Sequence, residues 1–336
     1  MSIIRLVQSD TVSYGLQSSE AERIEIPKEF TVVEAVPFRI KFNSVCERSF
    51  PPRPLKVSLD FSKTCFMDSS GIGALVSMAK MAKSADVTLA VCGLTPQVQA
   101  VLTMTGLDRV LIIESEATSD GLSVNDKSNR LPVTHASIRS RAKRVIDVIG
   151  AMVGLALTGL LFIPIAIAIK RDGPGSLFFC QTRCGWMGRE FKLWKFRSMV
   201  PDAEARKHEV KNDAQGAIFK AKYDPRITKV GHFLRRTSLD ELPQFWNVLL
   251  GSMSLVGTRP PTVVEVDQYD VPEWRRLDVK PGITGEWQVH GRSLVKDFED
   301  IIRLDLRYQR NWSLAYDFNL LIKTVTVVFS KGSGAM

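Results

Sequence analysis

The sequence predicts a small α/β domain of about a hundred residues, followed by a region that enters a membrane. Three observations lead to this prediction. Strand-like and helix-like stretches alternate between about residues 20 and 113, as in α/β domains. Residues 116–137 are mostly polar and lack periodicity, which indicates a linker. Residues 148–169 form the one long apolar stretch of the 336-residue chain, which is long enough for two domains of ordinary size.

The elements of the α/β domain follow from short apolar and alternating runs. Strands are expected at residues 24–26, 38–42, 55–59, 87–91 and 110–113. A helix is expected from the turn at residues 68–71 through residue 81. A second helix is expected at residues 96–105, where Gly106 provides a common helix end.

The apolar stretch at residues 148–169 has Thr158 as its one polar side chain. As a straight helix of about 22 residues it would measure about 33 Å, just enough for a hydrocarbon core of about 30 Å. Pro164 would kink or break that helix. Basic residues flank both ends, at residues 139–144 and 170–171, and cations of this kind mark the cytoplasmic side. A helix that enters one leaflet and returns satisfies both features, whereas a plain transmembrane anchor remains the alternative.

Composition narrows the possible partners. The net charge of +9 suits phosphate-bearing ligands or an anionic membrane surface. Nucleic acid is not expected as a partner, because no helix-turn-helix, zinc-finger or RNP-type pattern is present. No secretory signal pattern opens the chain, so the first domain is expected to be cytoplasmic. The five cysteines include no C-x-x-C pair, which fits reduced thiols and no zinc site: Cys46, Cys65, Cys92, Cys180 and Cys184.

Two adjacent carboxylates, Asp240 and Glu241, are the strongest candidates for chemistry. Arg235 and Arg236 precede them closely. Arginines bind phosphate oxygens through paired hydrogen bonds, and carboxylates hold Mg²⁺ or attack phosphorus, so this mixture suits phosphate transfer. A structural alternative is that Ser238 and Glu241 form a capping box and the carboxylates simply begin a helix.

Two motifs of the first domain resemble those of the STAS domain, the fold of anti-sigma-factor antagonists. They are residues 55–61 (LKVSLDF) and 66–73 (FMDSSGIG), and the resemblance covers about residues 20–118. In that family the first serine of the Asp-Ser-Ser-Gly turn is phosphorylated in regulatory members, which makes Ser69 a regulatory candidate. The alternative is that Ser69 only caps a helix. The domain is expected to make contacts, either in a homodimer or with a protein partner, through the helix that begins near Ser69.

The C-terminal region combines turns with cations in six short motifs. They are GPG at 173–175, QTRCG at 181–185, KFRSM at 195–199, DPRIT at 224–228, SLVGTRP at 254–260 and KPGITG at 280–285. Together with the carboxylate pair and the apolar stretch, they resemble the bacterial sugar transferases, which are monotopic polyprenyl-phosphate phosphoglycosyltransferases. The resemblance covers about residues 138–331. It implies a mainly helical domain with a re-entrant helix at 145–170, joined to the STAS-like domain by a linker at 119–137.

The resemblance also implies a reaction, in which a sugar 1-phosphate passes from a UDP-sugar to a polyprenyl (undecaprenyl) phosphate with release of UMP. This would be the first membrane step in the synthesis of an exopolysaccharide or O-antigen type of glycoconjugate, at the cytoplasmic face of the bacterial inner membrane. Asp240 would be the nucleophile that forms a phospho-aspartate, and Glu241 would bind the cofactor Mg²⁺. The implied phosphate-binding residues are Lys195, Arg235, Arg259 and Arg292.

Two positions depart from the family pattern. Thr258 stands where the family usually has proline, and Ile163 stands where it usually has serine before the proline of the membrane helix. Neither change removes a catalytic group. A different class of function also remains open: a non-catalytic, membrane-tethered STAS regulatory protein. A multi-span transporter is not expected, because the sequence has a single long apolar stretch.

Overall fold

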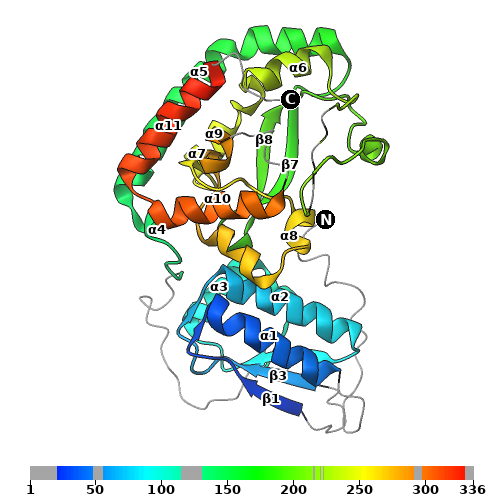
Figure 1. Cartoon of the computed structure of the whole chain (residues 1–336), viewed down its shortest axis with the longest axis vertical. Helices are drawn as coiled ribbons and strands as arrows, with labels where there is room; N and C mark the ends of the chain where they lie inside the picture. The colour runs from blue at the N-terminus through cyan, green and yellow to red at the C-terminus, as the bar shows by residue number, and fades with distance from the viewer. Residues whose placement is uncertain are drawn as a thin grey trace. The chain divides into compact units, whose positions relative to one another are not determined.

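The computed structural model (Figure 1) describes residues 21–47, 56–114, 131–214, 216–219, 221, 223–290 and 297–329. It divides into two compact units. Unit 1 holds the described residues up to Thr134 together with Met187–Arg189 and Asp267–Asp278, and unit 2 holds the other described residues from His135 onward. The predicted linker falls mostly outside the described residues.

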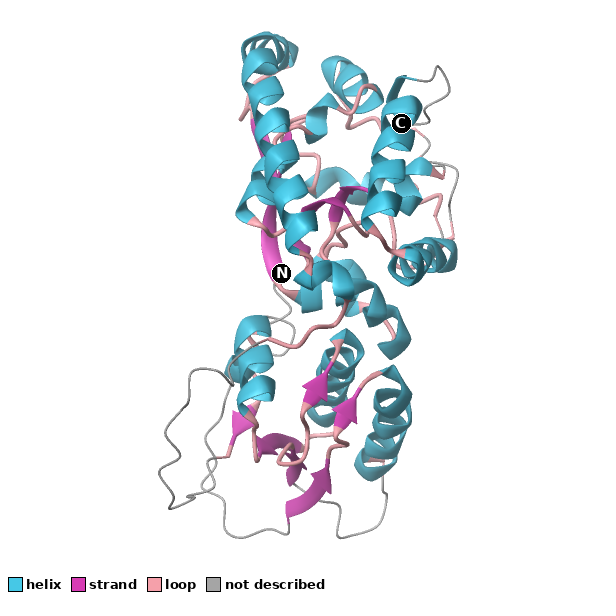
Figure 2. Cartoon of the chain, turned by 90° about the vertical axis from the view of Figure 1, so that its left-hand side faces the viewer, coloured by secondary structure: helices cyan, strands magenta, loops and turns pink. Residues whose placement is uncertain are grey.

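Unit 1 is built on a parallel four-stranded sheet in the order β1-β3-β5-β6. Its strands are β1 (Ala21–Glu25), β3 (Lys56–Asp60), β5 (Thr88–Cys92) and β6 (Ile112–Ile113), and a short parallel pair joins β2 (Glu29–Phe30) to β4 (Phe66–Met67). The helices are α1 (Val32–Cys46), α2 (Ser69–Ser84) and α3 (Pro96–Thr105), with a 3-10 turn η2 (Leu107–Arg109). Helices α1 and α2 pack against each other, and Figure 2 shows the strands of this unit flanked by helices. The α/β prediction for this region is confirmed.

The predicted strand at residues 38–42 is wrong, because this segment lies inside helix α1. The helix begins with a capping box in which the backbone N–H of Thr31 donates to Glu34 at 3.4 Å. Phe38 and Phe42 are both buried, as residues four apart on one helical face can be. Ile40, which a strand would bury on that same face, is 61% exposed. The five-residue alternation is compatible both with the two-residue period of a strand and with the 3.6-residue period of a helix. The observed burial of these side chains fits the helix.

Unit 2 is mainly helical, as the sequence predicts, and has two small sheets. Strands β7 (Phe178–Cys184) and β8 (Glu190–Phe196) form an antiparallel hairpin, while β9 (Ser254–Val256) pairs in parallel with β10 (Gly282–Thr284). The α-helices are α4 (Ala136–Arg139), α5 (Arg141–Asp172), α6 (Lys229–Arg236), α7 (Gln244–Leu250), α8 (Val263–Asp267), α9 (Glu286–Val289), α10 (Phe298–Asn311) and α11 (Leu314–Phe329). The 3-10 turns are η3 (Trp186–Gly188), η4 (Ala205–Glu209), η5 (Leu239–Glu241) and η6 (Val271–Asp278).

Helix α5 contains the long apolar stretch and bends into two arms (Figure 1). It is the one helix of the described chain that is long and apolar enough to cross a membrane. Pro164 lies within it, and a proline lacks the backbone donor and crowds the carbonyl four residues earlier, which accounts for a bend. The two arms agree with the predicted re-entrant helix, and the helix extends beyond the predicted range 145–170 at both ends.

Each arm of α5 packs on a different part of unit 2. On the first arm, Gly154 lies against Phe245 of α7, where a Cβ atom would come within 2.4 Å of the ring. On the second arm, Ile165 and Ile169 are buried against Phe196. The opposite face of α5 is strongly apolar and exposed, with Val145, Ile146, Ile149, Met152, Val153, Leu157, Leu160, Ile163 and Ile167. An exposed apolar face of this length is typical of a membrane-contacting helix.

Candidate active site

The two central carboxylates lie on a tight turn between two helices of unit 2. Helix α6 (Lys229–Arg236) is capped by Thr228, whose Oγ1 accepts from the backbone N–H of Gly231 at 3.0 Å. Ser238 then adopts a left-handed conformation with φ of 57°, and η5 carries Asp240 and Glu241. The side chain of Ser238 makes no capping hydrogen bond to this turn. The capping-box alternative for this segment is therefore wrong.

Lys195 brings the two carboxylates together. Its ammonium lies 2.9 Å from Oε1 of Glu241 and 4.0 Å from Oδ2 of Asp240. Asp240 is only 5% exposed, so its carboxylate lies in an interior where charge interactions are stronger than in water. One cation thus contacts both members of the pair that the sequence singles out.

Asn247 fixes the strand that carries this lysine to the helix that follows the carboxylates. The Oδ1 atom of Asn247, on α7, accepts from the backbone N–H of Trp194 at 3.2 Å, and its Nδ2 donates to the carbonyl of Lys192 at 2.7 Å. Both contacted residues lie in β8, within the three residues that precede Lys195. The amide therefore acts as a backbone clamp that holds Lys195 opposite the turn.

Arg235 lies at the end of α6, close to Asp240. Its Nε donates to Oγ of Ser198 at 3.0 Å. Burial lowers the pKa of Arg235, while the nearby charges of Asp240 and Asp224 act in the opposite direction. The guanidinium is thus a cation within electrostatic reach of the predicted nucleophile. Asp224 also forms a buried ion pair with Arg226 at 2.8 Å, which stabilises the turn before α6.

Arg259 is held in a bidentate ion pair with Glu265. Its two terminal nitrogens donate to the two carboxylate oxygens at 2.8 and 3.0 Å, and its guanidinium lies 5.7 Å from the ring centre of Trp287. Burial of Glu265 would raise its pKa, but the ion pair with Arg259 and the charge of Arg183 hold the pKa down at about 2. Arg259 is therefore oriented and partly neutralised.

Arg183 connects this pair with the carboxylate turn. Burial, and then the like charge of Arg259, lower its pKa to about 10, while Glu265 and Glu241 oppose the shift. Its Nη1 donates to the carbonyl of Pro260 at 2.9 Å. Arg183 and Glu265 are thus members of the charged cluster that the sequence-based assignments miss.

The structure brings Lys195, Arg235 and the two carboxylates together, and places Arg259 in the neighbouring cluster. Arg292 lies outside the described residues. The only signal that could have marked Arg183 was its place in the motif QTRCG, which the sequence analysis treats as a turn with a cation. The assigned roles of these residues in phosphate binding remain predictions.

The carboxylates of Asp240 and Glu241 offer oxygen ligands of the kind that Mg²⁺ prefers. The described residues contain no group of three or more His, Cys, Asp or Glu that could hold a metal ion alone. Mg²⁺ is commonly held by one or two carboxylates together with waters and substrate phosphates. The pair fits this mode, with Glu241 as the more accessible ligand, because Asp240 is the more deeply buried of the two.

Ser69 lies in unit 1 and is not an exposed residue. It is fully buried, and the helix cap is Asp68, whose side chain accepts from the N–H groups of Ser70 and Gly71. The backbone N–H of Ser69 donates at 3.0 Å to Oδ1 of Asp278, which belongs to η6. The alternative that Ser69 itself caps the helix is thus wrong. The start of α2, which the sequence analysis proposes for contacts with another molecule, is therefore covered by η6 of the same chain.

Comparison with known proteins matches a family model to each of the two predicted regions. The family model described as bacterial sugar transferase matches residues 138–331, which is more than half of the chain. The chain belongs to the bacterial sugar transferase family. The STAS domain model matches residues 14–119, so this sugar transferase carries an N-terminal STAS domain.

Curated relatives match the sugar transferase region. The galactosyl transferase CpsE of Streptococcus agalactiae is 50% identical over 196 residues, which cover 58% of this chain and 43% of the relative. The UDP-glucose:undecaprenyl-phosphate glucose-1-phosphate transferase of Escherichia coli is 42% identical, covering 54% of this chain and 39% of the relative. The exopolysaccharide production protein ExoY of Rhizobium meliloti is 39% identical, covering 58% of this chain and 89% of the relative. The sugar transferase therefore spans less than half the length of the first two relatives.

One solved structure, a sulfate transporter family protein from Wolinella succinogenes, overlaps 28% of this chain and 75% of its own chain. The overlap has a TM-score of 0.24 and 16% identity, which is too low to establish a shared fold.

Proposed function

We propose that this sugar transferase moves a sugar 1-phosphate from a UDP-sugar to a polyprenyl phosphate and releases UMP. The observation that carries the proposal is the buried carboxylate of Asp240, which shares the ammonium of Lys195 with Glu241 at 4.0 and 2.9 Å. The relatives support the substrate class, because the name of the Escherichia coli relative specifies UDP-glucose and undecaprenyl phosphate, and that of CpsE specifies a galactosyl transferase.

In the first step, a carboxylate oxygen of Asp240 attacks the phosphorus that carries the sugar. The bond from that phosphorus to the bridging oxygen breaks, and UMP leaves with that oxygen. A carboxylate and a diphosphate repel each other, so cations must lower the barrier. Lys195 and Arg235 are the described cations closest to this task, because both interact with Asp240.

In the second step, a phosphate oxygen of the polyprenyl phosphate attacks the same phosphorus. The bond to Asp240 breaks, which restores the carboxylate and leaves the sugar on a polyprenyl diphosphate. Glu241 would hold Mg²⁺, and the ion would supply positive charge that offsets the negative charge of the phosphates. Leu239 and Leu242 flank the carboxylates and pack with Ile165 of the second α5 arm, so the turn lies beside the helix proposed to enter the membrane.

The reaction would take place at the cytoplasmic face of the inner membrane, where UDP-sugars are available. The exposed apolar face of the bent α5 supports insertion from one side. Single cysteines replacing Arg139 and Arg171, in a background without native cysteines, should both react with a reagent confined to the cytoplasmic side. Labelling from opposite sides would show that α5 crosses the membrane.

The activity is tested with the purified chain, a polyprenyl phosphate and a panel of UDP-sugars, by following UMP release. Asp240→Asn should abolish release and prevent transfer of a radiolabelled β-phosphate to the protein when the acceptor is omitted. Glu241→Gln should lower the rate and raise the Mg²⁺ concentration needed for half-maximal activity. Asp202→Asn, which changes an exposed acid of the same unit, is the matched control and should leave both readouts unchanged.

Normal turnover by Asp240→Asn would contradict the assignment of Asp240 as the nucleophile. No UMP release by the wild type with any UDP-sugar of the panel would instead favour the non-catalytic regulatory protein.

A further inference from the structure

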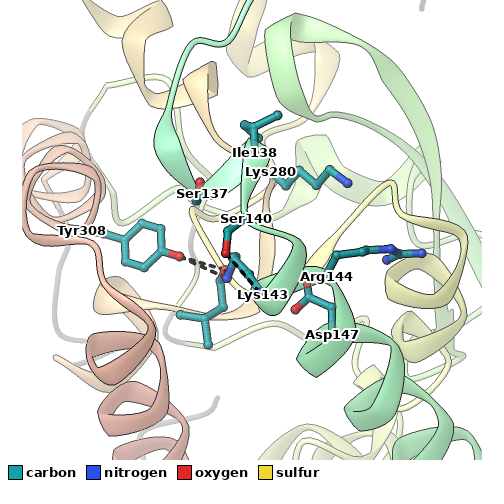
Figure 3. A pocket seen from close by; sticks show the side chains of 9 residues that line it. Ser137, Ile138, Ser140, Lys143, Arg144, Asp147, Lys280 and Tyr308 are labelled. Carbon is teal, nitrogen blue, oxygen red and sulfur yellow. Dashed lines mark hydrogen bonds between the residues drawn. The ribbon is translucent and has the colours of Figure 1, made fainter.

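A small cavity of about 70 Å³ lies at the start of α5 in unit 2 (Figure 3). Its lining residues are Ser137, Ile138, Ser140, Lys143, Arg144, Asp147, Val256, Lys280 and Tyr308. Among the described residues, the carboxylates Asp240 and Glu241 do not line it. The cavity is therefore a second polar site of the molecule, to which the proposed reaction assigns no role.

Two of the three cations of the cavity have structural tasks. Lys143 donates to Asp317 at 2.5 Å and to the carbonyl of Val256 at 3.0 Å, in a buried ion pair. Arg144 donates to the carbonyls of Val248 and Leu249 at 2.8 and 2.7 Å, which end α7. Both contacts of Arg144 are to neutral carbonyls, so among the described residues no ion pair offsets its positive charge.

Lys280 differs from both, because its ammonium has no hydrogen bond or ion pair within the described part of the chain. Burial, and then the charge of Arg144, lower its pKa. Asp147 acts in the opposite direction, but this carboxylate already accepts from Oγ of Ser254 and the N–H of Leu255, each at 2.9 Å. Holding a partly buried cation beside another cation is unfavourable unless an anion offsets the charge.

The charges around the cavity do not cancel. Lys143, Arg144 and Lys280 contribute three positive charges, against one each from Asp147 and Asp317, which leaves a net charge of +1. The first turn of α5 adds the positive end of a helix dipole. Hydroxyl groups also line the cavity, so a bound anion could accept hydrogen bonds as well as charge.

The position of the cavity along α5 indicates where such an anion would come from. The exposed apolar face of the helix begins at Val145 and continues through Ile146 and Ile149, directly after Arg144 of the cavity. Lipid phosphates lie at the edge of the hydrocarbon region, next to the point where an inserted helix becomes apolar. Lys280 and Arg144 extend to the same side of the cavity in Figure 3.

We propose that this cavity binds a phosphate group carried on a lipid, with Lys280 as the residue that contacts it. The small volume suits a single small anionic group. The lipid could be an anionic phospholipid or a polyprenyl phosphate, since both present a phosphate at this depth. The site does not require the proposed transferase activity, and its test needs no UDP-sugar.

The test measures the reaction of Lys280 with an amine-directed reagent by mass spectrometry, with the full chain in non-ionic detergent. A lysine with a lowered pKa reacts readily when its ammonium has no anion beside it. Added polyprenyl phosphate or phosphatidylglycerol should slow the reaction of Lys280 about tenfold, as expected for a gained charge-assisted hydrogen bond. Inorganic phosphate forms the third arm, and equal protection by it would show that the site does not select a lipid. Lys211, an exposed lysine of the same unit, is the internal control and should be unaffected.

The three arms distinguish the source of the phosphate. Protection by both lipids but not by inorganic phosphate supports a headgroup site that needs the lipid as an anchor. Protection by polyprenyl phosphate alone assigns the site to that lipid. No protection of Lys280 in any arm, at an ionic strength matched with chloride, overturns the proposal.

A variant provides the second readout. Lys280→Met should be at least as stable as the wild type in detergent alone, because the substitution removes a partly buried cation that has no ion pair with any described residue. The melting temperature of the wild type should rise with the protecting lipid, and that of Lys280→Met should not. Lys211→Met carries the same change in net charge and should respond as the wild type does. An equal rise in Lys280→Met would show that the phosphate binds elsewhere.

Discussion

The negative charge of Glu265 should stabilise the charged cluster that it forms with Arg259 and Arg183 in unit 2. We expect Glu265→Gln, which keeps the shape of the side chain, to destabilise this region. The pKa of Glu265 is about 2, against an ordinary value of 4.5. Since one pH unit corresponds to about 1.4 kcal/mol, the ionised form is favoured over a neutral one by roughly 3 kcal/mol in the folded state. The variant leaves Arg259 and Arg183 close together without the shared carboxylate.

Hydrogen–deuterium exchange of a peptide covering residues 254–266 measures this effect locally, so it does not require the two units to unfold together. A loss of roughly 3 kcal/mol corresponds to exchange that is faster by about two orders of magnitude. Glu204→Gln, a change at an exposed glutamate of the same unit, is the control and should exchange like the wild type. UDP should restore more protection to Glu265→Gln than to the wild type, because a diphosphate can replace the lost negative charge.

The stabilisation by Glu265 should also depend on pH, and the direction of its pKa shift determines how. The folded-state pKa of Glu265 is lowered, so its stabilisation is fully present above pH 4.5 and is lost as the pH falls toward about 2. The difference between wild type and Glu265→Gln should therefore be constant from pH 5 to pH 8 and shrink below pH 4.5. Equal protection of the two proteins at pH 7 would refute this account of the cluster.

Two further predictions concern other parts of the molecule. Burial and the neighbouring Asp68 raise the pKa of Asp278 to about 7, so protection of the α2 amides should be greatest below pH 4, fall as the pH rises to about 7 and then level off. Asp278→Asn should weaken this dependence and leave only the part due to Asp68, whose pKa burial also raises, and a variant that retains it in full would contradict the assignment. Gly231→Ala would place a Cβ atom 2.0 Å from the carbonyl oxygen of Ser198, so α6 must shift. Because Arg235 is on α6, UMP release should fall at least tenfold with the fold retained by circular dichroism, and unchanged activity would refute the requirement for this close packing.

The central strands of unit 1 could be predicted from sequence because each of them carries its own signal. Strands β3 and β5 are buried along most of their length. In the sequence β5 is mostly apolar, whereas β3 is marked by alternating apolar and polar residues. Helix α1 could not be recognised in the same way. Its five-residue alternation from Phe38 to Phe42 is compatible with both a strand and a helix, and only the exposure of Ile40 decides between them.

The carboxylate pair could be predicted for a similar reason, since Asp240 and Glu241 are adjacent in the sequence. The cluster around Arg183 could not, because its members come from separate segments. An antiparallel bridge pairs Arg183 with Thr262, and the N–H of Cys184 donates to the carbonyl of Pro261 at 2.9 Å. No local pattern encodes this contact, which depends on how distant segments pair in the folded chain.

The burial of the proposed nucleophile and its position beside the membrane helix have one physical cause. Leu239 and Leu242 stand on either side of the carboxylate pair, and both pack in the same cluster as Ile165 and Ile169 of the second α5 arm. Burying an ionised group is costly, and the packing of these leucines against α5 and the nearby cations Lys195 and Arg235 offset the cost for Asp240. A bend in α5 therefore does more than keep the helix on one side of a membrane. It presents the second arm as the apolar support for the turn, so the carboxylate that would attack the sugar nucleotide lies next to the surface from which a lipid phosphate would arrive.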